Sequence, residues 1–383
     1  MKLSFFKFKP FKFYILAFCV TLPCEVFAIN GNDISARSAV IICSDSFDKI
    51  WGKNENEKLP MASTTKIMTS ILALQKAAAQ GNQEFEITEE MINVEGTSMG
   101  LMPEDKINLE TLAKGMLLPS GNDAANAAAI LISGTLEKFV ELMNEHGKQI
   151  GMKNTNFCTP SGLDYGNHCS TAIDMAVLGA YAMENENFSS IVRKNHIKIN
   201  FSDSKRTIML ENHNKLLKLY KYCVGIKTGF TKKAGRCLVS CAEKNDVRLV
   251  AVTLNAPNDW DDHKKLYEFG FNSVVTKTFD ESNFLKELPL IKGELEKFEV
   301  IGTTKFKRTF RKGSEQNLTR VVELPKSLKA PVEKGSVVGQ VSYFLGNKKV
   351  GENILTVKES VPAKKRKNIF KIIGEFFSNI FKK

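Results

Sequence analysis

Residues 60–75 read PMASTTKIMTSILALQ, and the architecture of this chain can be worked out from them. From Ile67 onward, apolar residues recur at the spacing of a helix that buries one face. Ser63 and Lys66 stand at the start of this helix. Residues three positions apart on a helix share a face, so the lysine amine can reach the serine hydroxyl. Backbone N–H groups at a helix N-terminus lack partners and suit a developing oxyanion. The stretch therefore predicts a serine nucleophile paired with a lysine.

The Ser-x-x-Lys spacing is weak evidence alone, because it occurs four times in the chain and a serine before a helix is often only an N-cap. Two further motifs follow it in order. SGN at 120–122 is the only Ser-x-Asn, and KTG at 227–229, at the end of a predicted strand, is the only Lys-Thr-Gly. Together the three motifs form the set of penicillin-binding proteins and class A β-lactamases, whose middle motif is Ser-Asp-Asn.

Helical patterns cover residues 66–79, 109–118, 122–132 and 136–150, and strand patterns cover 223–228, 236–242 and 247–254. The first two strands flank a Gly/Lys turn, which predicts a hairpin. Because helices bracket the strands in sequence, we expect helices packed on one antiparallel sheet, an α/β (α+β) domain over 29–277. Beyond about residue 280, short alternating runs separated by turns predict a small all-β domain over 285–361.

The formal net charge of +12 is concentrated in the two ends of the chain. Lysines precede a short apolar run, and VFA at 26–28 offers small residues for cleavage, so residues 1–28 are interpreted as a secretory signal peptide. Residues 364–383 combine a basic run with an amphipathic helical pattern, which favours a helix lying on a membrane surface. An uncleaved N-terminal anchor and a terminal helix docked on the protein itself are the alternatives.

These ends predict where the mature chain acts. We expect it to be secreted across the cytoplasmic membrane and held at the outer face of that membrane by 364–383. Because the body between the ends is nearly neutral, nucleic acid is not an expected partner.

Six cysteines follow residue 28, and their spacing matches no zinc-binding pattern. Cys158 and Cys169 are close enough in sequence to bridge, but six cysteines allow many pairings. In a chain with a core this large, we expect buried free thiols. The segment NDWDDH at 258–263 is interpreted as a loop entering a helix rather than as a metal site. No metal and no cofactor is predicted.

The chain resembles the low-molecular-mass penicillin-binding proteins that are serine-type D-Ala-D-Ala carboxypeptidases. The blocks PMASTTKIMT, LLPSGNDAANA, GMKNTNF, HCSTAIDMA and GIKTGFTKKAGRCLVS look like that family, and KAPVEKGSVVGQVSYFLGNKKVGE looks like its C-terminal β domain. The resemblance covers nearly the whole chain. It implies a β-lactamase/transpeptidase-like catalytic domain with its site between the sheet edge and the helical region. It also implies removal of the terminal D-alanine from peptidoglycan stem pentapeptides, and acylation by β-lactams.

The resemblance assigns roles to the first two motifs. Ser63 would be the nucleophile that forms an acyl-enzyme, and Lys66 the general base. A lysine acts as a base only when neutral, so its pKa must be lowered by burial and by a neighbouring cation, for which Lys227 is the candidate. Ser120 would relay a proton to the leaving amine, and Asn122 would hold the substrate amide and Lys66.

The third motif would bind substrate. By the same resemblance, Lys227 and Thr228 would contact the terminal carboxylate, and Gly229 would let the substrate backbone lie against the strand. The backbone N–H groups of Ser63 and Phe230 would form the oxyanion hole. Some relatives add an arginine at the carboxylate, near 258–263, where this chain has acidic residues and a tryptophan.

Three other functions remain open at this stage. A class A β-lactamase needs a glutamate for deacylation, and no Glu-x-x-x-Asn segment lies between 120 and 227. A D,D-endopeptidase that cuts D-Ala cross-links would use the same motifs, and a non-catalytic penicillin-binding scaffold would keep the fold alone. His168 lies in a family block, but serine–lysine chemistry needs no histidine, so we interpret it as structural.

Overall fold

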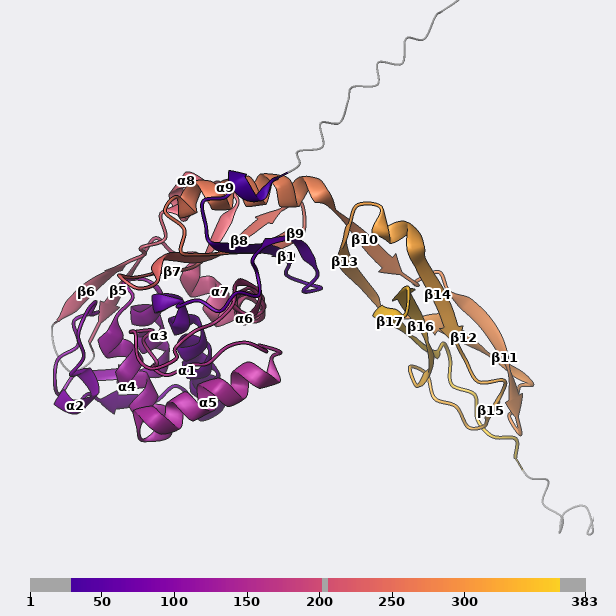
Figure 1. The fold of residues 1–383 in the computed structure, drawn as a ribbon. Helices are drawn as coiled ribbons and strands as arrows, with labels where there is room; N and C mark the ends of the chain where they lie inside the picture. Colours follow the sequence, from indigo (N-terminus) through magenta and orange to yellow (C-terminus); the bar gives the residue numbers. More distant parts are fainter. Residues whose placement is uncertain (1–28, 202–205, 366–383) are drawn as a thin grey trace, which may run out of the picture.

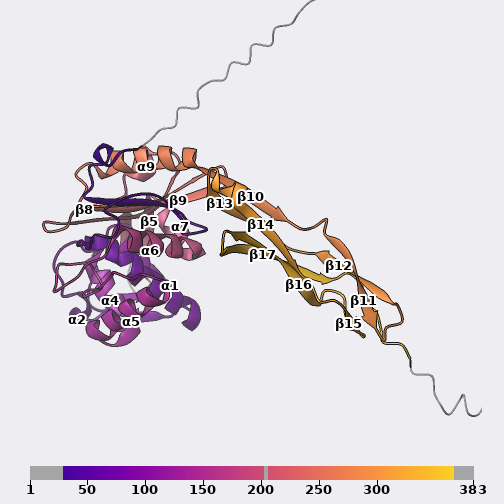
Figure 2. The ribbon, with the colours of Figure 1, turned by 45° about the vertical axis from the view of Figure 1, so that its right-hand side comes forward.

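The computed structural model describes residues 29–201 and 206–365, which form an α/β domain followed by an elongated β domain (Figures 1 and 2). The predicted signal peptide at 1–28, and all of the predicted terminal helix beyond residue 365, lie outside the described residues. Within the two described ranges, no helix is both long enough and apolar enough to cross a membrane.

The α/β domain is built on a five-stranded antiparallel sheet in the order β2-β1-β9-β8-β7. Its strands are β1 (Ser38–Cys43), β2 (Lys49–Lys53), β7 (Cys223–Thr231), β8 (Gly235–Lys244) and β9 (Val247–Leu254). The three predicted strands are present, and the predicted hairpin is β7–β8. Strand β7 is longer than predicted, because it continues through the KTG motif to Thr231. It is also an edge strand, so one side of its backbone is free to meet other groups.

Helices cover both faces of this sheet (Figure 1). On one face lie α1 (Lys66–Gln80), α2 (Glu89–Ile92), α3 (Leu109–Leu117), α4 (Asn122–Ser133), α5 (Leu136–Gln149), α6 (Ala172–Glu184) and α7 (Glu186–Val192); on the other lie α8 (Leu216–Leu219) and α9 (Asp259–Ser273). Strand β1 shows why both layers are needed. Val40 and Ile42 pack into the core with α1 and α6, while Ile41 and Cys43 pack into the core with α9. Successive side chains on a strand point to opposite faces, so a strand buried along its whole length needs two covers.

Two short ribbons and two 3₁₀ turns complete this domain. They are β3 (Glu84–Glu86) with β4 (Lys106–Asn108), β5 (His196–Asn200) with β6 (Thr207–Glu211), η1 (Gly31–Asp33) and η2 (Ala62–Thr65). Arg206, at the start of the second ribbon, donates to the Gly100 carbonyl at 2.6 Å and pairs with Asp105. The ribbon thereby fixes the loop that precedes β4.

The β domain begins directly after α9. Its strands are β10 (Val274–Asp280), β11 (Leu285–Ile291), β12 (Lys297–Gly302), β13 (Lys305–Arg311), β14 (Leu318–Glu323), β15 (Leu328–Lys329), β16 (Val337–Leu345) and β17 (Lys348–Val357), with η3 at Ser314–Asn317. A six-stranded sheet, β14-β16-β17-β12-β11-β15, packs against the β10–β13 pair around Phe279, Phe310 and Tyr343. Strand β10 pairs with β13 along its whole length, so residues 274–277, which the interval 29–277 placed in the first domain, already start the β domain, although the Val274 side chain still packs in the core beside α9.

Acidic residues of the α/β domain meet basic residues of the β domain where the two domains join. Asp45 accepts a hydrogen bond from the Thr309 backbone at 2.7 Å, and Asp48 pairs with Lys348 at 2.7 Å. Asp246 pairs with Lys307 at 2.7 Å. These contacts, together with the direct passage from α9 into β10, join the two domains (Figure 2).

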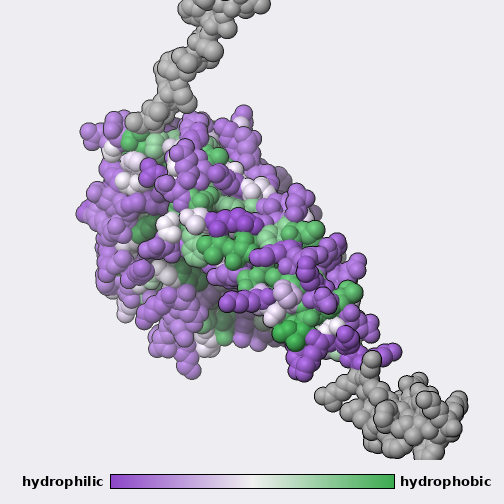
Figure 3. Space-filling model, turned by 90° about the vertical axis from the view of Figure 1, so that its right-hand side faces the viewer, coloured by the Kyte–Doolittle hydropathy of each residue, from purple (hydrophilic) through white to green (hydrophobic). Residues whose placement is uncertain are grey.

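The outer face of the β domain carries apolar residues in one cross-strand row. Leu285 is paired with Ile301, Ile301 with Thr356, and Thr356 with Val337. Leu285 and Val337 are exposed. Viewed from the side of the β domain, the surface shows hydrophobic residues gathered among polar ones (Figure 3).

Candidate active site

Ser63 lies in the 3₁₀ turn η2, which directly precedes α1, and not in α1 itself. In a 3₁₀ turn, residues three apart eclipse one another, which aligns Ser63 with Lys66 more directly than an α-helix would. Thr64 Oγ1 closes the turn by donating to the Met61 carbonyl at 2.6 Å, and Ala62 adopts a left-handed φ of 48°. Ser63 is the one residue of η2 that is not buried. The turn therefore presents the serine hydroxyl to the cleft.

Lys66 is completely buried, and its amine lies at the centre of the site. Its Nζ is 2.6 Å from Asn122 Oδ1, 2.7 Å from the Ser161 carbonyl oxygen and 3.0 Å from Ser63 Oγ. A neutral amine has two N–H donors and one lone pair. The first two neighbours are acceptors and take the two N–H groups, so the lone pair is left for the proton of Ser63.

Burial lowers the pKa of Lys66 well below its ordinary value, and the nearby charge of Lys227 lowers it further, while Asp123 opposes the shift. Burial also lowers the pKa of Lys227, to about 7. Because the charge of one buried amine lowers the pKa of the other, the two amines disfavour being charged together. The arrangement therefore favours a neutral lysine beside Ser63.

The SGN motif connects the loop before α4 to Lys66. Ser120 has a left-handed φ of 68° and lines the same cleft as Ser63. Asn122 accepts from Lys66 and donates from Nδ2 to the Glu95 carbonyl at 2.7 Å, so its amide orientation is fixed from both ends. A non-glycine residue with positive φ costs free energy and persists where the surroundings impose it.

Gly229 on β7 packs against the nucleophile turn. A Cβ placed there would lie 3.0 Å from the Met61 carbonyl oxygen, 3.0 Å from Thr64 N and 3.1 Å from Ser63 N. The sequence analysis assigned this glycine to substrate approach. The structure shows a more immediate reason for glycine, because any side chain would push the turn away from the strand. The contact also brings Ser63 N close to the strand that carries Phe230.

The cleft has a volume of about 310 Å³. It is lined by Ser63, Thr97, Ser120, His213, Lys215, Thr228, Gly229, Phe230, Arg236, Asp259 and Trp260. All three motifs therefore meet here: Ser63, Ser120, Thr228, Gly229 and Phe230 line the cleft, while Lys66, Asn122 and Lys227 are buried behind it. The ring of Phe230 is 66% exposed at the rim.

Arg236 enters the cleft from β8. Its Nε and Nη2 donate to Asp259 Oδ1 at 3.0 and 2.6 Å, and its guanidinium lies 5.3 Å from the centre of the Trp260 ring. The side chain remains 41% exposed, whereas that of Asp259 is 3% exposed. Burial raises the pKa of Asp259, and the charge of Arg236 opposes that rise. A fixed guanidinium with an open face is thus present near Thr228.

The segment 258–263 enters α9, as the sequence predicted, and its polar side chains have other partners. Asp262 accepts from the Ser35 backbone at 2.8 Å, and His263 lies between Ser240 Oγ and Thr253 Oγ1. Within the described ranges, no group of three or more His, Cys, Asp or Glu residues could hold a metal ion.

His168 contacts the nucleophile turn without contacting Ser63. Its Nδ1 accepts from the Cys158 backbone N–H at 2.9 Å, and its Nε2 is 2.8 Å from Thr65 Oγ1. A neutral imidazole with Nδ1 accepting must donate from Nε2. Burial lowers its pKa to about 4, which favours that neutral form. These contacts suit a structural residue.

Sequence reasoning missed several residues that build the site. The Ser161 carbonyl, on the loop before α6, is invisible to a side-chain motif search. Asp123 follows the SGN motif directly, but the sequence assigned it no role. It accepts from the backbone N–H groups of Met99 and Leu101 at 2.9 and 3.1 Å, and so holds the loop that carries Thr97. An acidic residue directly after the SGN motif was the one signal available for it.

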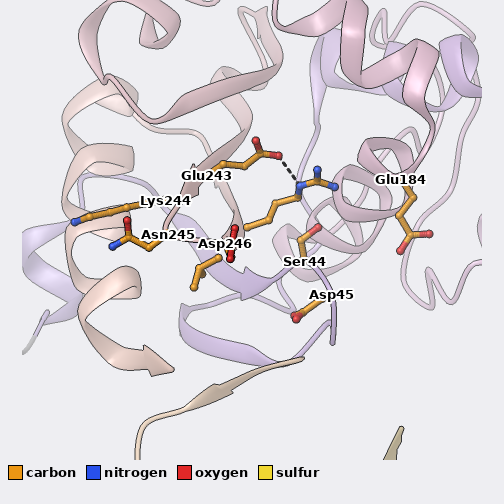
Figure 4. A pocket seen from close by; sticks show the side chains of 9 residues that line it. Ser44, Asp45, Glu184, Glu243, Lys244, Asn245 and Asp246 are labelled. Atoms are coloured by element: carbon orange, nitrogen blue, oxygen red, sulfur yellow. Dashed lines mark hydrogen bonds and ion pairs between the residues drawn. The ribbon is translucent and has the colours of Figure 1, made fainter. Parts of the chain in front are cut away.

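A larger cavity, of about 510 Å³, lies at the other end of β8 and β9, beside the domain junction (Figure 4). Glu243 on its wall is paired with Arg248 at 2.7 Å, and Asp45 and Asp246 use their carboxylates at the junction. Ser44 and Lys244 both line this cavity, but the Lys244 amine lies over the rings of Tyr222 and Phe271, 5.1 and 5.6 Å from their centres. The serine–lysine pair predicted from the sequence lies elsewhere, in the cleft of Ser63.

Comparison with known proteins agrees with this geometry. Residues 25–258 match the family model described as D-alanyl-D-alanine carboxypeptidase, and residues 275–363 match that of the penicillin-binding protein 5 C-terminal domain. The chain is 32% identical over 360 residues to D-alanyl-D-alanine carboxypeptidase DacA of Haemophilus influenzae, covering 90% of each protein. It is 30% identical over 334 residues to DacF of Bacillus subtilis, covering 85% of this chain and 86% of that protein.

Solved structures give the same result. Penicillin binding protein 5 from Haemophilus influenzae aligns with a TM-score of 0.66 at 31% identity, covering 88% of this chain and 100% of that one. The Streptomyces K15 DD-transpeptidase aligns with a TM-score of 0.59 at 26% identity, covering 62% of this chain and 97% of that one. With the serine–lysine site in the cleft and both domain models matched in order, the chain belongs to the D-alanyl-D-alanine carboxypeptidase family, the serine peptidases among the low-molecular-mass penicillin-binding proteins.

Proposed function

We propose that this D-alanyl-D-alanine carboxypeptidase removes the terminal D-alanine of peptidoglycan stem pentapeptides through an acyl-enzyme on Ser63, and that β-lactams acylate the same serine. One observation carries the proposal. Lys66 Nζ lies 3.0 Å from Ser63 Oγ while its two N–H groups are taken by Asn122 and Ser161. This is the geometry of a general base with its lone pair aimed at the nucleophile.

Acylation would proceed as follows. The Ser63 hydroxyl gives its proton to Lys66 Nζ, and Ser63 Oγ attacks the carbonyl carbon of the penultimate D-alanine. The backbone N–H groups of Ser63 and Phe230 stabilise the resulting oxyanion. Collapse of the tetrahedral intermediate breaks the peptide bond, and the proton held on Lys66 passes through Ser120 to the departing amine. Free D-alanine leaves, and the shortened peptide stays on Ser63 as an ester.

Deacylation repeats the same chemistry with water. Lys66, neutral again, takes a proton from a water molecule whose oxygen attacks the ester carbon, and Ser63 is released with its proton restored. Of the described residues that line the cleft, Asp259 is the only carboxylate, and it is paired with Arg236. A class A β-lactamase relies on a glutamate for this step, so efficient β-lactam hydrolysis is not expected here.

The test of this function is release of free D-alanine from two substrates. The first is a tripeptide ending in D-Ala-D-Ala, and the second is a cross-linked wall fragment joined through D-alanine. A carboxypeptidase releases D-alanine from the first and leaves the cross-link intact. Cleavage of the cross-link alone would indicate an endopeptidase. Covalent binding of penicillin without turnover of either substrate would indicate a scaffold and contradict the proposal.

Arg236 is proposed to bind the carboxylate of the terminal D-alanine together with Thr228. The support is its open guanidinium face in the cleft, held by Asp259 and Trp260. Replacing Arg236 by Gln is expected to lower kcat/KM about 10- to 100-fold, mainly through KM, because a charge-assisted hydrogen bond contributes about 1.5–3 kcal/mol.

The measurement compares free-acid and amidated peptides. The amidated substrate lacks the carboxylate, so its turnover should respond little to Arg236→Gln. Arg193→Gln is the control, because Arg193 also pairs with a carboxylate, that of Glu243 at 2.7 Å, but lies outside the cleft. An equal loss of kcat/KM on both peptides would show that Arg236 does not bind the substrate carboxylate.

We also propose that the mature protein acts at the outer face of the cytoplasmic membrane, held there by 364–383. The support is the basic and amphipathic pattern of that segment and the signal-like pattern of 1–28. The last described residue lies at the end of the β domain far from the α/β domain (Figure 1). A tail bound to lipid would therefore leave the cleft away from the bilayer surface. Deleting 366–383 and measuring binding to anionic vesicles tests this proposal.

A further inference from the structure

The loop from Cys158 to Cys169 forms the back wall of the site. Its Ser161 carbonyl accepts from Lys66, and its Pro160 carbonyl accepts from Thr69 Oγ1 at 2.6 Å. Gly162 lies so close to the nucleophile turn that a Cβ there would be 2.0 Å from the Ala62 carbonyl oxygen. Any opening of this loop would release Lys66 from one of its two acceptors.

The two cysteines lie at the ends of this loop, where the chain pairs with itself. Asn156 and Cys169 exchange both backbone hydrogen bonds, at 2.9 and 3.1 Å. Such a closely paired couple has Cα atoms about 5.5 Å apart. Cys158 stands two residues beyond Asn156, and the contact of its Sγ with Asn156 Nδ2 at 3.1 Å places both side chains on the same side of the chain, so Cys158 lies diagonally across from Cys169. Diagonal Cα atoms lie about 7–8 Å apart in a sheet, and a disulfide spans about 4.4–6.8 Å, so the two segments move closer when the bond forms.

The surroundings of the sulfurs agree with this placement. Asn156 Nδ2, whose residue faces Cys169 across the pair, lies 3.1 Å from Cys158 Sγ. Burial raises the pKa of Cys169, and the charge of Cys158 also acts to raise it. Both are free thiols in this structure.

We propose that Cys158 and Cys169 are a redox site, whose disulfide closes the loop behind Lys66 and stabilises the active site. Cys158 is partly exposed and lines an open cavity of about 630 Å³, through which a disulfide reagent can reach it. The other four described cysteines, Cys43, Cys223, Cys237 and Cys241, are buried with raised pKa values, which makes them poor nucleophiles.

The oxidant is an external disulfide. The Cys158 thiolate attacks one of its sulfurs, forms a mixed disulfide and releases the first thiol of the reagent. The Cys169 thiolate then attacks Cys158 Sγ and displaces the second thiol. The two cysteines lose two electrons and two protons in total, and the external disulfide becomes two thiols.

The closed ring holds twelve residues, Cys158 to Cys169. Closing a loop of this size restricts the unfolded chain and raises the melting temperature by about 5 °C in a domain of this length. Because the ring contains the acceptor of Lys66, the oxidised protein should also retain β-lactam acylation at temperatures where the reduced protein loses it.

The experiment uses the full chain, reduced and then exposed to oxidised glutathione. Non-reducing peptide mapping should show a Cys158–Cys169 link, and Tm should rise by about 5 °C. Cys158→Ser and Cys169→Ser, treated identically, should show neither the link nor the rise. Absence of the linked peptide overturns the proposal, and so does a linked peptide with unchanged Tm. Both readouts are independent of D-alanine release, so failure of this proposal can be distinguished from failure of the proposed function.

Discussion

Ser63→Ala should abolish both release of D-alanine and covalent labelling by penicillin, with a loss in kcat of about 10⁴-fold or more. The reason is that Ser63 Oγ supplies the bond to the acyl group, and within the described cleft the other serine, Ser120, lies on a separate motif. The measurement is D-alanine release from a tripeptide ending in D-Ala-D-Ala, together with the mass of the protein after incubation with penicillin.

The fold offers a close control for this variant. Ser46 and Lys49 repeat the Ser-x-x-Lys spacing near β2, but they lie outside the cleft. Ser46→Ala should therefore leave both activities unchanged. Ser63→Ala should also keep the Tm of the parent protein, because Ser63 is partly exposed and, among the described residues, its hydroxyl has Lys66 as its hydrogen-bonding neighbour. A penicillin adduct on the Ser63→Ala protein would contradict the assignment of the nucleophile.

Lys66→Arg should lower the rate of β-lactam acylation about 10²- to 10⁴-fold. Arginine keeps a positive charge and hydrogen-bond donors, but it stays protonated at any working pH and cannot accept the proton of Ser63. Lys66→Met should lose a similar factor while leaving no buried charge behind. If both variants lose a similar factor in acylation rate while keeping the parent Tm, the loss is due to the missing base and not to reduced stability.

The pH dependence gives an independent readout of the same residue. The pKa of Lys66 is lowered by burial and by Lys227, which favours the free base. Acylation should fall as pH decreases through this pKa, because protonation occupies the lone pair. Lys66→Arg should lack that acid limb, and Lys49→Arg should retain it. A parent rate that increases toward acid pH would contradict the role of Lys66 as base.

The neutral form of Lys66 is favoured by its tertiary contacts and not by its local sequence. Lys66 is buried with a cation nearby, and Asn122 and the Ser161 carbonyl take its two N–H groups. Each acceptor is itself held in place: Asn122 by the Glu95 carbonyl, and Ser161 by the tight contact of Gly162 with the nucleophile turn. Loss of either support should act through the position of Lys66 and not through substrate binding.

Much of the fold could be predicted from local patterns. The helix after Ser63 follows from side-chain periodicity, which reports on burial of one face, and the strand at 247–254 follows from a short run rich in β-branched and other apolar residues. The boundary between the two domains was harder to predict from the sequence. Residues 274–277 follow α9 without a turn signal, and the pairing of β10 with β13 is what connects them to the β domain.

Strands β1 and β2 illustrate a second limit. They stand nearest the N-terminus of the described chain, yet β1 lies beside β9, more than two hundred residues later. Its continuous burial comes from helices on both faces, so it lacks the alternation that marks a strand with one open face.

Local patterns were enough for the fold class, the order of the three motifs and the choice of Ser63 as the candidate nucleophile, because these depend on residue types at short, fixed spacings. The folded chain adds what no local pattern contains: burial that favours a neutral Lys66, the Ser161 carbonyl as one of its acceptors, and Arg236 in the cleft with Asp259 behind it. These features depend on tertiary contacts because pKa values and hydrogen-bond partners are set by burial and by groups far apart in the chain. Ser161 stands 95 positions from Lys66, and no local pattern records that they meet.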